Sequence, residues 1–305
     1  MGIIRTVLGD ISPEDFGPAL VHEHILVDSN PSNGVNEYDP EEVFEIMFPY
    51  LIEIRDLGIR GFVECSTAYM GRDVRILKKL SKATGIHILA NTGFFLEPYI
   101  PKYAFEYSIE DIANEWIKEI NEGIDGTDVK AGFIKIAIEP GKMKEIYVKT
   151  VKAAAQCSLS TGAVIACHME SGKVAMIVLD ILEKEGLNGD RLIFVHADSE
   201  EVLDYHLKAA SRGVWIEYDR VNQQTSERTL KLIEFMVRNG FEDKILLSQD
   251  SGWYSVGQPS GGNIRGYGYL VRDFLPLMLK RGFSQDLINR IIVDNPAKAF
   301  QMEKL

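Results

Sequence analysis

Short apolar runs alternate with longer stretches of helical periodicity along almost the whole chain. A continuous apolar run is typical of a strand buried on both faces, and apolar residues three or four apart are typical of an amphipathic helix. We predict strands at residues 19–27, 59–66, 87–92, 131–137, 163–169, 191–196, 214–218 and 244–248. Helical periodicity is clearest at residues 41–57, 108–122, 144–161, 173–185 and 226–239. This alternation predicts a parallel sheet covered by helices.

The number of strand–helix units indicates the architecture. Eight predicted strands within 305 residues favour a closed (β/α)8 TIM barrel, an α/β fold with a single domain over residues 1–305, over an open doubly wound sheet. No G-x-G-x-x-G motif follows the first of these strands, which weakens a dinucleotide-binding alternative. Residues 3–8 read as an ordinary first strand.

Charge and cysteine content exclude several classes of protein. The 33 basic and 45 acidic side chains give a net charge of −12, which argues against a nucleic-acid partner or an anionic membrane surface. Three cysteines without paired spacing argue against a disulfide scaffold. No signal-peptide pattern opens the sequence and no 18 apolar residues follow one another. We therefore expect a cytoplasmic protein that acts on a small molecule.

Residues with metal-binding chemistry fall at matching places on different predicted strands. They are His22, His24, His168 and His196, with Lys135 and Asp250 in equivalent positions. In a barrel, the carboxyl ends of the strands converge on one face, where active sites are built. His22 and His24 form an H-x-H, so both imidazoles share one face of a strand and can bind one ion. Each histidine alone could be a hydrogen-bonded core residue, and Asp250 could cap a turn. Their common placement predicts a metal centre.

Lys135 lies in the middle of the apolar stretch AGFIKIAIEPG. A desolvated ammonium is costly unless it is paired or loses its proton. Two explanations are open at this point. Lys135 forms an ion pair with a carboxylate such as Glu64 or Asp250, or its neutral amine reacts with carbon dioxide to give a carbamate. The two carbamate oxygens could bridge two divalent cations, which would stabilise them electrostatically.

The remaining histidines and cysteines are expected to have structural roles. His87 begins the third predicted strand, away from its carboxyl end, and His206 is expected on the surface of a helix. Cys65 and Cys167 read as small core residues within strands.

Taken together, these motifs resemble the phosphotriesterase family of the amidohydrolase superfamily. The resemblance runs from GPALVHEH to DNPAKAF, and KAGFIKIA is similar to the form seen in phosphotriesterase-like lactonases. It implies a binuclear centre with these ligands: His22, His24 and Asp250 for the more buried ion, His168 and His196 for the more exposed ion, and carboxylated Lys135 as the bridge. Zinc is the ion expected, with manganese, cobalt and iron as alternatives. A mononuclear site with an unmodified lysine is the remaining chemical alternative.

The resemblance also implies an activity. A metal-bridging hydroxide would attack a lactone or carboxylic ester, Asp250 would move the proton, and organophosphate triesters would be promiscuous substrates. Arg220 matches an arginine that supports the substrate pocket of the lactonases; its alternative is a salt bridge with Asp219. Homodimers are common among such relatives.

Two departures from the lactonase pattern concern the substrate. Phe95 stands where lactonases carry a tyrosine, and Gln249 precedes the strand-eight aspartate. Both positions belong to the face where loops set specificity in this fold.

The glycine-rich segment 251–267 is a third departure, and we expect it to form a mobile lid. Trp253 and Tyr254 are expected to wall the pocket, and Arg265 and Tyr267 to contact an anionic group, although loop packing explains the last two equally well. The alternatives to a lactonase are a phosphorylated sugar-lactone hydrolase and a metal-bearing barrel that binds a ligand without turning it over.

Overall fold

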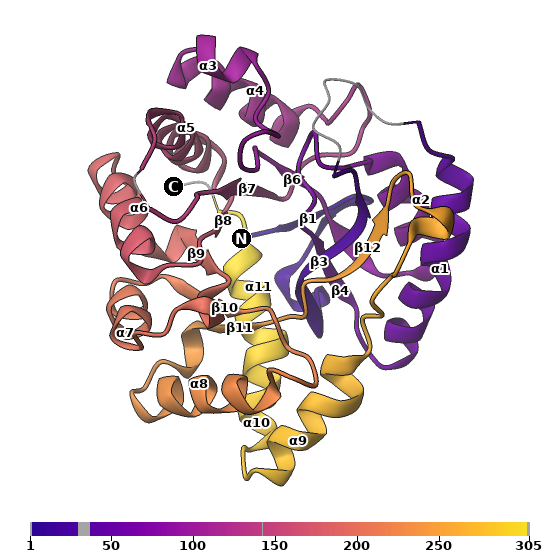
Figure 1. Ribbon diagram of the computed structural model, residues 1–305, viewed down its shortest axis with the longest axis vertical. Helices are drawn as coiled ribbons and strands as arrows, with labels where there is room; N and C mark the ends of the chain where they lie inside the picture. The colour runs from indigo at the N-terminus through magenta and orange to yellow at the C-terminus, as the bar shows by residue number, and fades with distance from the viewer. Residues whose placement is uncertain (1, 30–36, 142, 304–305) are drawn as a thin grey trace.

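The strands form a (β/α)8 barrel in the computed structural model, which describes residues 2–29, 37–141 and 143–303 (Figure 1). Each of the eight predicted strands is present, and the third and eighth are interrupted. The barrel strands are β3 (Ala19–Val27), β4 (Gly61–Glu64), β5 (His87–Leu89) with β6 (Asn91–Thr92), β7 (Phe133–Ala137), β8 (Ile165–His168), β9 (Leu192–Val195), β10 (Trp215–Tyr218), and β11 (Ile245–Leu247) with β12 (Ser251–Ser255).

Parallel pairing runs around the barrel in two arcs. One has the order β11-β10-β9-β8-β7-β6 and the other β12-β3-β4-β5. The arcs meet at the two interrupted strands. There the Gly132 amide donates to the Ala90 carbonyl at 2.8 Å, and the Asp250 amide donates to the His22 carbonyl at 3.1 Å. Hydrogen bonding therefore continues across both interruptions, which is the closure that the alternating pattern predicts.

Amphipathic helices surround the strands. The longer ones are α1 (Pro40–Asp56), α2 (Val74–Thr84), α4 (Ile109–Asn121), α5 (Glu145–Thr161), α6 (Gly172–Lys184), α7 (Asp204–Ser211) and α8 (Ser226–Arg238). Short helices are α3 (Tyr103–Glu106), α9 (Leu275–Lys280), α10 (Gln285–Asn289) and α11 (Asn295–Phe300). Local sequence fixes several ends: at α4 the Ser108 hydroxyl accepts from the Asp111 amide, and the Asp111 carboxylate accepts from the Ser108 amide.

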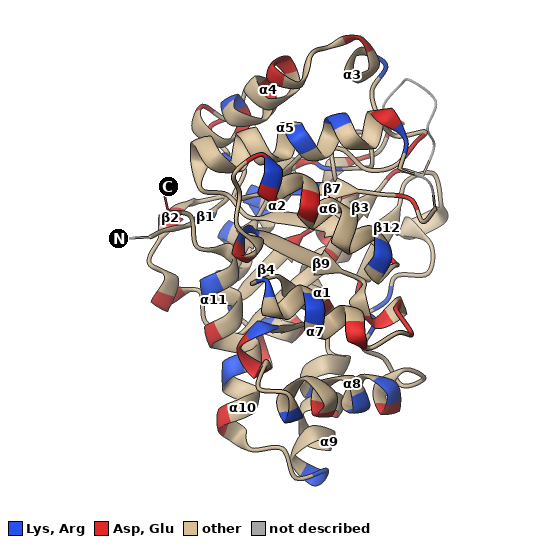
Figure 2. Ribbon diagram, turned by 90° about the vertical axis from the view of Figure 1, so that its left-hand side faces the viewer, with Lys and Arg blue, Asp and Glu red and all other residues tan. Residues whose placement is uncertain are grey.

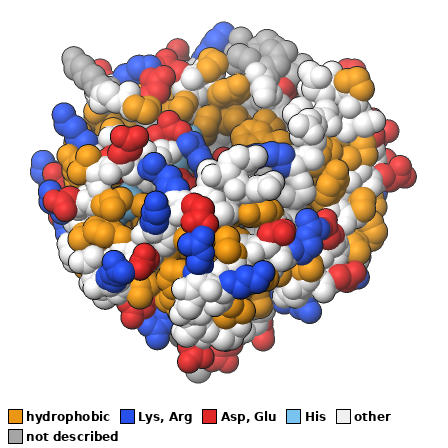
Figure 3. Space-filling view, turned by 60° about the horizontal axis from the view of Figure 1, so that its bottom comes forward, with side chains coloured by type: hydrophobic (Ala, Val, Ile, Leu, Met, Phe, Trp, Pro, Cys, Tyr) orange, Lys and Arg blue, Asp and Glu red, His pale blue; other side chains and the backbone are white. Residues whose placement is uncertain are grey.

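Apart from the buried residues at the metal-binding end of the barrel, charged side chains lie mostly on the outside of this arrangement. Figure 2 shows basic and acidic residues interspersed along the helices, whereas β9 in the centre of that view has no charged residue. The face in Figure 3 likewise mixes acidic, basic and hydrophobic side chains. Among the described residues, no helix is both long and apolar enough to cross a bilayer. The predicted core cysteines are confirmed, since Cys65 and Cys167 are buried and free.

Strand β3 carries a bulge that determines where its side chains point. Its register against β4 shifts between Leu20 and Glu23. Val21 packs into the apolar cluster inside the barrel. The adjacent His22 also faces the interior, where its Nε2 lies 3.4 Å from Lys135 Nζ. A bulge re-aims side chains in this way, so the metal-binding end of the barrel begins directly above its apolar floor.

Two expectations from the sequence, for residues 3–8 and for the segment 251–267, need correction. Residues 3–8 do form a strand, β1 (Ile4–Thr6), but it pairs with β2 (Gly9–Ile11) as an antiparallel hairpin outside the barrel. The segment 251–267 is not a lid throughout, because its first part is β12, paired with β3. Gly252 and Arg265 then exchange backbone hydrogen bonds of 2.8 and 3.0 Å, which fold the rest of the segment back onto β12.

Candidate metal centre

The barrel brings the predicted metal-binding residues together at the carboxyl ends of its strands. The His22 ring lies 5.5 Å from that of His24 and 5.0 Å from that of His196, centroid to centroid. The His196 and His168 rings are 4.4 Å apart. Lys135 Nζ lies 3.4 Å from His22 Nε2. Side chains from β3, β7, β8 and β9 therefore form one continuous cluster.

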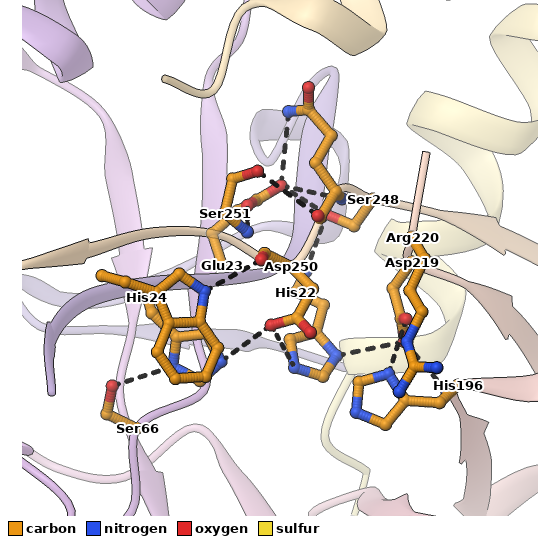
Figure 4. A network of polar contacts seen from close by, with 12 residues as sticks. His22, Glu23, His24, Ser66, His196, Asp219, Arg220, Ser248, Asp250 and Ser251 are labelled. Atoms are coloured by element: carbon orange, nitrogen blue, oxygen red, sulfur yellow. Dashed lines mark hydrogen bonds and ion pairs between the residues drawn. The ribbon is translucent and has the colours of Figure 1, made fainter. Parts of the chain in front are cut away.

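Asp250 completes this cluster from the interruption between β11 and β12. Its Oδ1 lies 3.2 Å from His24 Nε2 and 3.9 Å from His22 Nε2 (Figure 4). The ligand atoms of these three residues lie within 4.8 Å of one another, close enough to hold one ion. Asp250 Oδ1 is buried and accepts no hydrogen bond from the part of the chain that the structure describes. An unpartnered carboxylate oxygen beside two imidazoles fits a divalent cation.

Three of the four imidazoles have a hydrogen-bonding partner at Nδ1, on the side of the ring away from the cluster. The contacts are His22 Nδ1 to Glu217 Oε1 at 2.7 Å, His24 Nδ1 to Ser66 Oγ at 2.9 Å and His196 Nδ1 to Asp219 Oδ1 at 2.6 Å. An acceptor at Nδ1 keeps the proton on that nitrogen and leaves Nε2 free to bind a metal. The arrangement therefore presents three oriented Nε2 atoms to the barrel interior.

A second group of potential ligands consists of His22, His196 and Asp219. Asp219 approaches both imidazoles at Nδ1, at 3.3 Å from His22 and 2.6 Å from His196. It therefore lies behind the two rings, on the side away from their Nε2 atoms. We assign Asp219 to the support of the histidines and not to the ligand set.

Burial sets the protonation states that metal binding needs. Desolvation lowers the pKa of His22 to about 3 and lowers the pKa values of His24 and His168. Burial alone would raise the pKa of Asp250, but the contact with His24 and the nearby imidazoles lower it well below its usual range. At neutral pH these three imidazoles are neutral and the carboxylate is ionised, which are the forms that ligate metal.

Among the residues that the structure describes, Lys135 has no carboxylate partner. Its side chain is only 2% exposed, and among the described residues it forms no ion pair within 4.0 Å. Glu64, one proposed partner, instead accepts from the Ser66 amide at 3.1 Å, and burial raises its pKa to about 7. An ion pair with Glu64 or Asp250 therefore does not explain the buried lysine. The donor set of imidazoles, a carboxylate and this amine fits divalent transition metals.

Comparison with known proteins agrees with this geometry. The family model "Phosphotriesterase family" matches residues 2–300. The chain belongs to the phosphotriesterase family. It is 30% identical to an aryldialkylphosphatase of Saccharolobus solfataricus, covering 95% of this chain and 96% of that protein. It is 28% identical to a phosphotriesterase homology protein of Escherichia coli, covering 95% of this chain and all of that protein.

A further relative carries a different name. An N-acetyltaurine hydrolase of Tetraodon nigroviridis is 26% identical over 97% of both chains. As a member of the phosphotriesterase family, the chain is a metal-dependent hydrolase that acts on ester or phosphoester bonds. Enzymes of this family use two metal ions. The cluster of His22, His24, Lys135 and Asp250 is where the described residues could hold such ions.

Two of the predicted substrate residues border the cluster. The Phe95 ring packs edge-on against His168, with centroids 5.2 Å apart. The Trp253 ring lies 4.3 Å from that of His24, and its Nε1 donates to the Asp250 carbonyl at 2.9 Å. In this member of the phosphotriesterase family, aromatic rings therefore border the cluster in two places: Phe95 beside His168 and Trp253 beside His24.

The other residues predicted to contact the substrate lie elsewhere. Tyr254 is buried, and its pKa is raised by burial and by nearby Glu42 at the start of α1, so it faces the helix layer. The Tyr267 hydroxyl donates to the His24 carbonyl at 2.6 Å, and its ring packs edge-on against Phe62. Arg265 is exposed and donates to the Asp250 carbonyl. Tyr254 and Tyr267 are thus packing residues, because β12 continues the barrel wall where a free loop was expected.

Arg220 lines a cavity of about 490 Å³ beside the cluster. Its Nη1 donates to Ser199 Oγ at 2.6 Å, and it forms an ion pair with Glu170, not the pair with Asp219 that was the alternative to a role in the pocket. The cavity is lined almost entirely by polar side chains: Glu170, Asp198, Ser199, Arg220, Thr225, Arg228 and Thr229, with Pro140. Asp198 Oδ1 is buried there and has no hydrogen-bond partner among the described residues.

Sequence reasoning missed the residues that support the ligands, and it misplaced one histidine. Glu217 and Asp219 are two apart at the end of β10, so strand parity could have assigned them to one face. Ser66 had no such signal. His206 is fully buried and not on a helix surface; its Nδ1 lies 2.9 Å from the Tyr218 hydroxyl, and burial lowers its pKa to about 4.

Proposed function

We propose that the protein hydrolyses a lactone or carboxylic ester at a binuclear metal centre, with weaker activity on organophosphate triesters. One observation carries this proposal: oriented imidazoles meet a buried lysine and a buried Asp250 oxygen, and among the described residues the lysine has no carboxylate partner and the oxygen has no donor. Both ester classes require an activated water and a stabilised oxyanion, so one centre serves both.

The ligand assignment that we propose is the one implied by the resemblance to the family, and the clustering of these side chains supports it. His22, His24 and Asp250 would hold the more buried ion, His168 and His196 would hold the more exposed ion, and the carbamate of Lys135 would be a ligand shared by both. When bound, two divalent ions lower the pKa of a coordinated water and polarise the scissile bond. Zinc is the ion we propose, because nitrogen and oxygen donors at low coordination number suit it.

The chain's own residues supply proton transfer and orientation. Asp250 is ionised and lies next to both imidazoles of β3, so it can accept a proton from water and pass it on. Phe95 and Trp253 flank the centre and can hold the apolar part of a substrate away from water. Arg220 lies at the polar cavity, where it can bind an oxygen-rich part of the same substrate.

The polar cavity supports a second candidate, in which the substrate carries an anionic group. Arg220 and Arg228 both line it, and guanidinium groups pair well with phosphate, sulfonate and carboxylate. A phosphorylated sugar lactone is one such substrate. The name N-acetyltaurine hydrolase, carried by several relatives, makes an acylated aminosulfonate another. Tyr267 no longer supports this candidate, since its hydroxyl is engaged by the His24 carbonyl.

A turnover panel tests these candidates. Purified protein is reconstituted with zinc, manganese or cobalt in bicarbonate buffer and assayed on simple lactones, phosphorylated lactones, aryl esters, N-acyl aminosulfonates and a phosphotriester. We expect lactone or ester hydrolysis that is lost on chelation. Arg220→Met then separates the candidates, because it should lower kcat/KM by about 10-fold or more only for substrates with an anionic group. A metal-loaded protein that turns over no substrate would favour the non-catalytic ligand-binding barrel.

We further propose a homodimer in the cytoplasm. All three cysteines are free and buried, which is compatible with a reducing compartment. Light scattering on the metal-loaded protein gives the mass in solution, and a monomer at micromolar concentration would remove the dimer from the proposal.

A further inference from the structure

Glu23 lies between the two metal-binding histidines of β3 but does not belong to the metal centre itself. In Figure 4 its carboxylate lies on the opposite side of the strand from the His22 and His24 rings. It is fully buried, and no lysine or arginine among the described residues pairs with it. A buried carboxylate without a cation must be satisfied by hydrogen-bond donors.

All of those donors come from the residues on either side of Asp250. Oε1 accepts from Ser248 Oγ at 2.8 Å, from the Gln249 amide at 3.1 Å and from Gln249 Nε2 at 3.5 Å. Oε2 accepts from the Ser251 amide at 2.7 Å. One side chain of β3 therefore holds the chain immediately before and immediately after the proposed ligand Asp250.

Asp250 occupies a conformation that needs such support. Its φ of 50° lies in the left-handed region, which is uncommon for a residue other than glycine. It also lies where β11 has ended and β12 has not begun, so regular strand pairing does not hold it. Its own amide makes one contact, to the His22 carbonyl at 3.1 Å. Strained conformations persist only where the surrounding structure determines them.

The Gln249 side chain extends this support to the segment that follows. Its Nε2 donates to the Tyr267 carbonyl at 2.6 Å, and its Oε1 accepts from the Leu270 amide at 2.8 Å. Tyr267 in turn donates to the His24 carbonyl. The hydrogen bonds thus return to β3, and they form a closed network around Asp250.

We infer that Glu23 is a positioning residue that fixes Asp250 relative to His22 and His24. This inference rests on the proposed metal centre. Because Glu23 is the residue between the two histidines, a displacement of residues 248–251 along β3 breaks its hydrogen bonds. The carboxylate therefore couples three ligands of one ion, from two distant parts of the sequence, into one geometry before the ion binds.

The variant Glu23→Gln tests this role with little change in shape. It replaces one acceptor oxygen with an amide NH2 group, which must face a donor whichever way the side chain is turned, because all of Glu23's partners donate. We expect the affinity for one of two Zn²⁺ ions to fall by about 10-fold or more, with the second ion unaffected. The probe is Zn²⁺ itself, titrated into metal-free protein against a chromophoric chelator.

Two further variants separate positioning from general stability. Ser158→Ala removes a buried hydrogen bond to the Ala163 carbonyl, of 2.6 Å, near the other end of the barrel. It should lower Tm and leave both zinc affinities unchanged. Ser248→Ala removes a single donor to Glu23 and also the acceptor of the His22 amide. It should weaken the same ion by a smaller factor than Glu23→Gln, and it serves in its place if that variant does not fold.

The outcomes are distinct. Weakening of one zinc ion in Glu23→Gln and Ser248→Ala, but not in Ser158→Ala, supports the inference. Unchanged zinc affinities in both variants, with only a loss of Tm like that of Ser158→Ala, overturn it. A wild-type protein that binds no Zn²⁺ in the same titration contradicts the proposed metal centre, which is a different failure.

Discussion

The two halves of the proposed metal centre differ in how firmly their side chains are held. In the half formed by His22, His24 and Asp250, Glu217 and Ser66 contact the two imidazoles, and Glu23 holds the residues on either side of Asp250. In the other half, His196 rests on Asp219. His168 is partly exposed, and no hydrogen bond to its imidazole is formed by the described residues.

This difference suggests that one half serves to retain its ion and the other serves to contact the substrate. A ligand with fixed partners loses little freedom when an ion binds, so the first half is built to retain its ion. His168 borders Phe95 and lies two residues from Glu170 of the polar cavity. We therefore propose that the second half faces the substrate and adapts to it. The predictions below test whether the two halves behave unequally.

The largest effect is expected from Asp250→Asn. The amide keeps the size of the side chain but removes its charge and its capacity to take up a proton. We expect kcat/KM to fall by about 10³-fold or more, with loss of the more tightly bound ion. Steady-state kinetics and elemental analysis after dialysis measure both effects. Full metal content with nearly normal turnover would show that the firmly held half is not required.

A smaller effect is expected when a support is weakened and the ligand is kept. Glu217→Gln leaves His22 in place but replaces the carboxylate at 2.7 Å from its Nδ1 with a neutral amide. The affinity for the buried ion should fall by about 10- to 100-fold, measured by chelator competition. The affinity for the second ion is the internal control, and an equal loss at both ions would contradict the division between the halves.

A substitution beside the second half, which contains His168 and His196, should mainly change substrate binding. Phe95→Leu removes the ring that packs on His168 and keeps an apolar side chain. We expect zinc affinities within about 3-fold of wild type and a change of about 3- to 10-fold in KM for substrates with apolar groups. Metal loss as large as that in Glu217→Gln would mean that Phe95 supports the ligand and not the substrate.

The smallest effect concerns a buried histidine outside the centre. The pKa of His206 is lowered by burial to about 4, so between about pH 6.5 and pH 4 the unfolded chain binds a proton there and the folded chain does not. The stabilising contribution is present above pH 6.5 and is lost as the pH falls, by up to about 3 kcal/mol at pH 4.

Comparison with His206→Phe isolates this contribution. Denaturant unfolding of both proteins at pH 7 and pH 4.5 should show that the free energy of unfolding falls less on acidification for the variant. Added zinc should leave the difference between the two proteins unchanged, since His206 is not a proposed ligand. A zinc-dependent difference would link His206 to the centre.

The barrel and the meeting of its ligands could be predicted from the sequence. Continuous apolar runs such as FIKIA and LIFV locate buried strands, and parallel strands of a barrel deliver their carboxyl ends to one face. That is why His168 and His196 were expected to be neighbours. The constraint comes from the fold alone, so it needs no knowledge of side-chain contacts.

The residues that support the proposed ligands, and the packing of the segment 251–267, could not be predicted in the same way. Strand parity places Glu23 opposite its flanking histidines, but its partner Ser248 is 225 residues away. Tyr254 and Tyr267 lie in a glycine-rich segment that reads as a loop, whereas in the structure Tyr254 belongs to β12, which pairs with β3, and the Tyr267 hydroxyl donates to the His24 carbonyl. His206 was misplaced because helical periodicity does not reveal that Tyr218 lies beneath it.

The central claim is that Lys135, as a carbamate, joins two ions held by the two unequal halves. Crystals of zinc-loaded protein grown with bicarbonate, measured above and below the zinc absorption edge, test it most directly. The account predicts two anomalous peaks about 3.5–4 Å apart, with carboxylate density on Lys135 Nζ between them. A single peak beside His22 and His24, with an unmodified lysine, would contradict it.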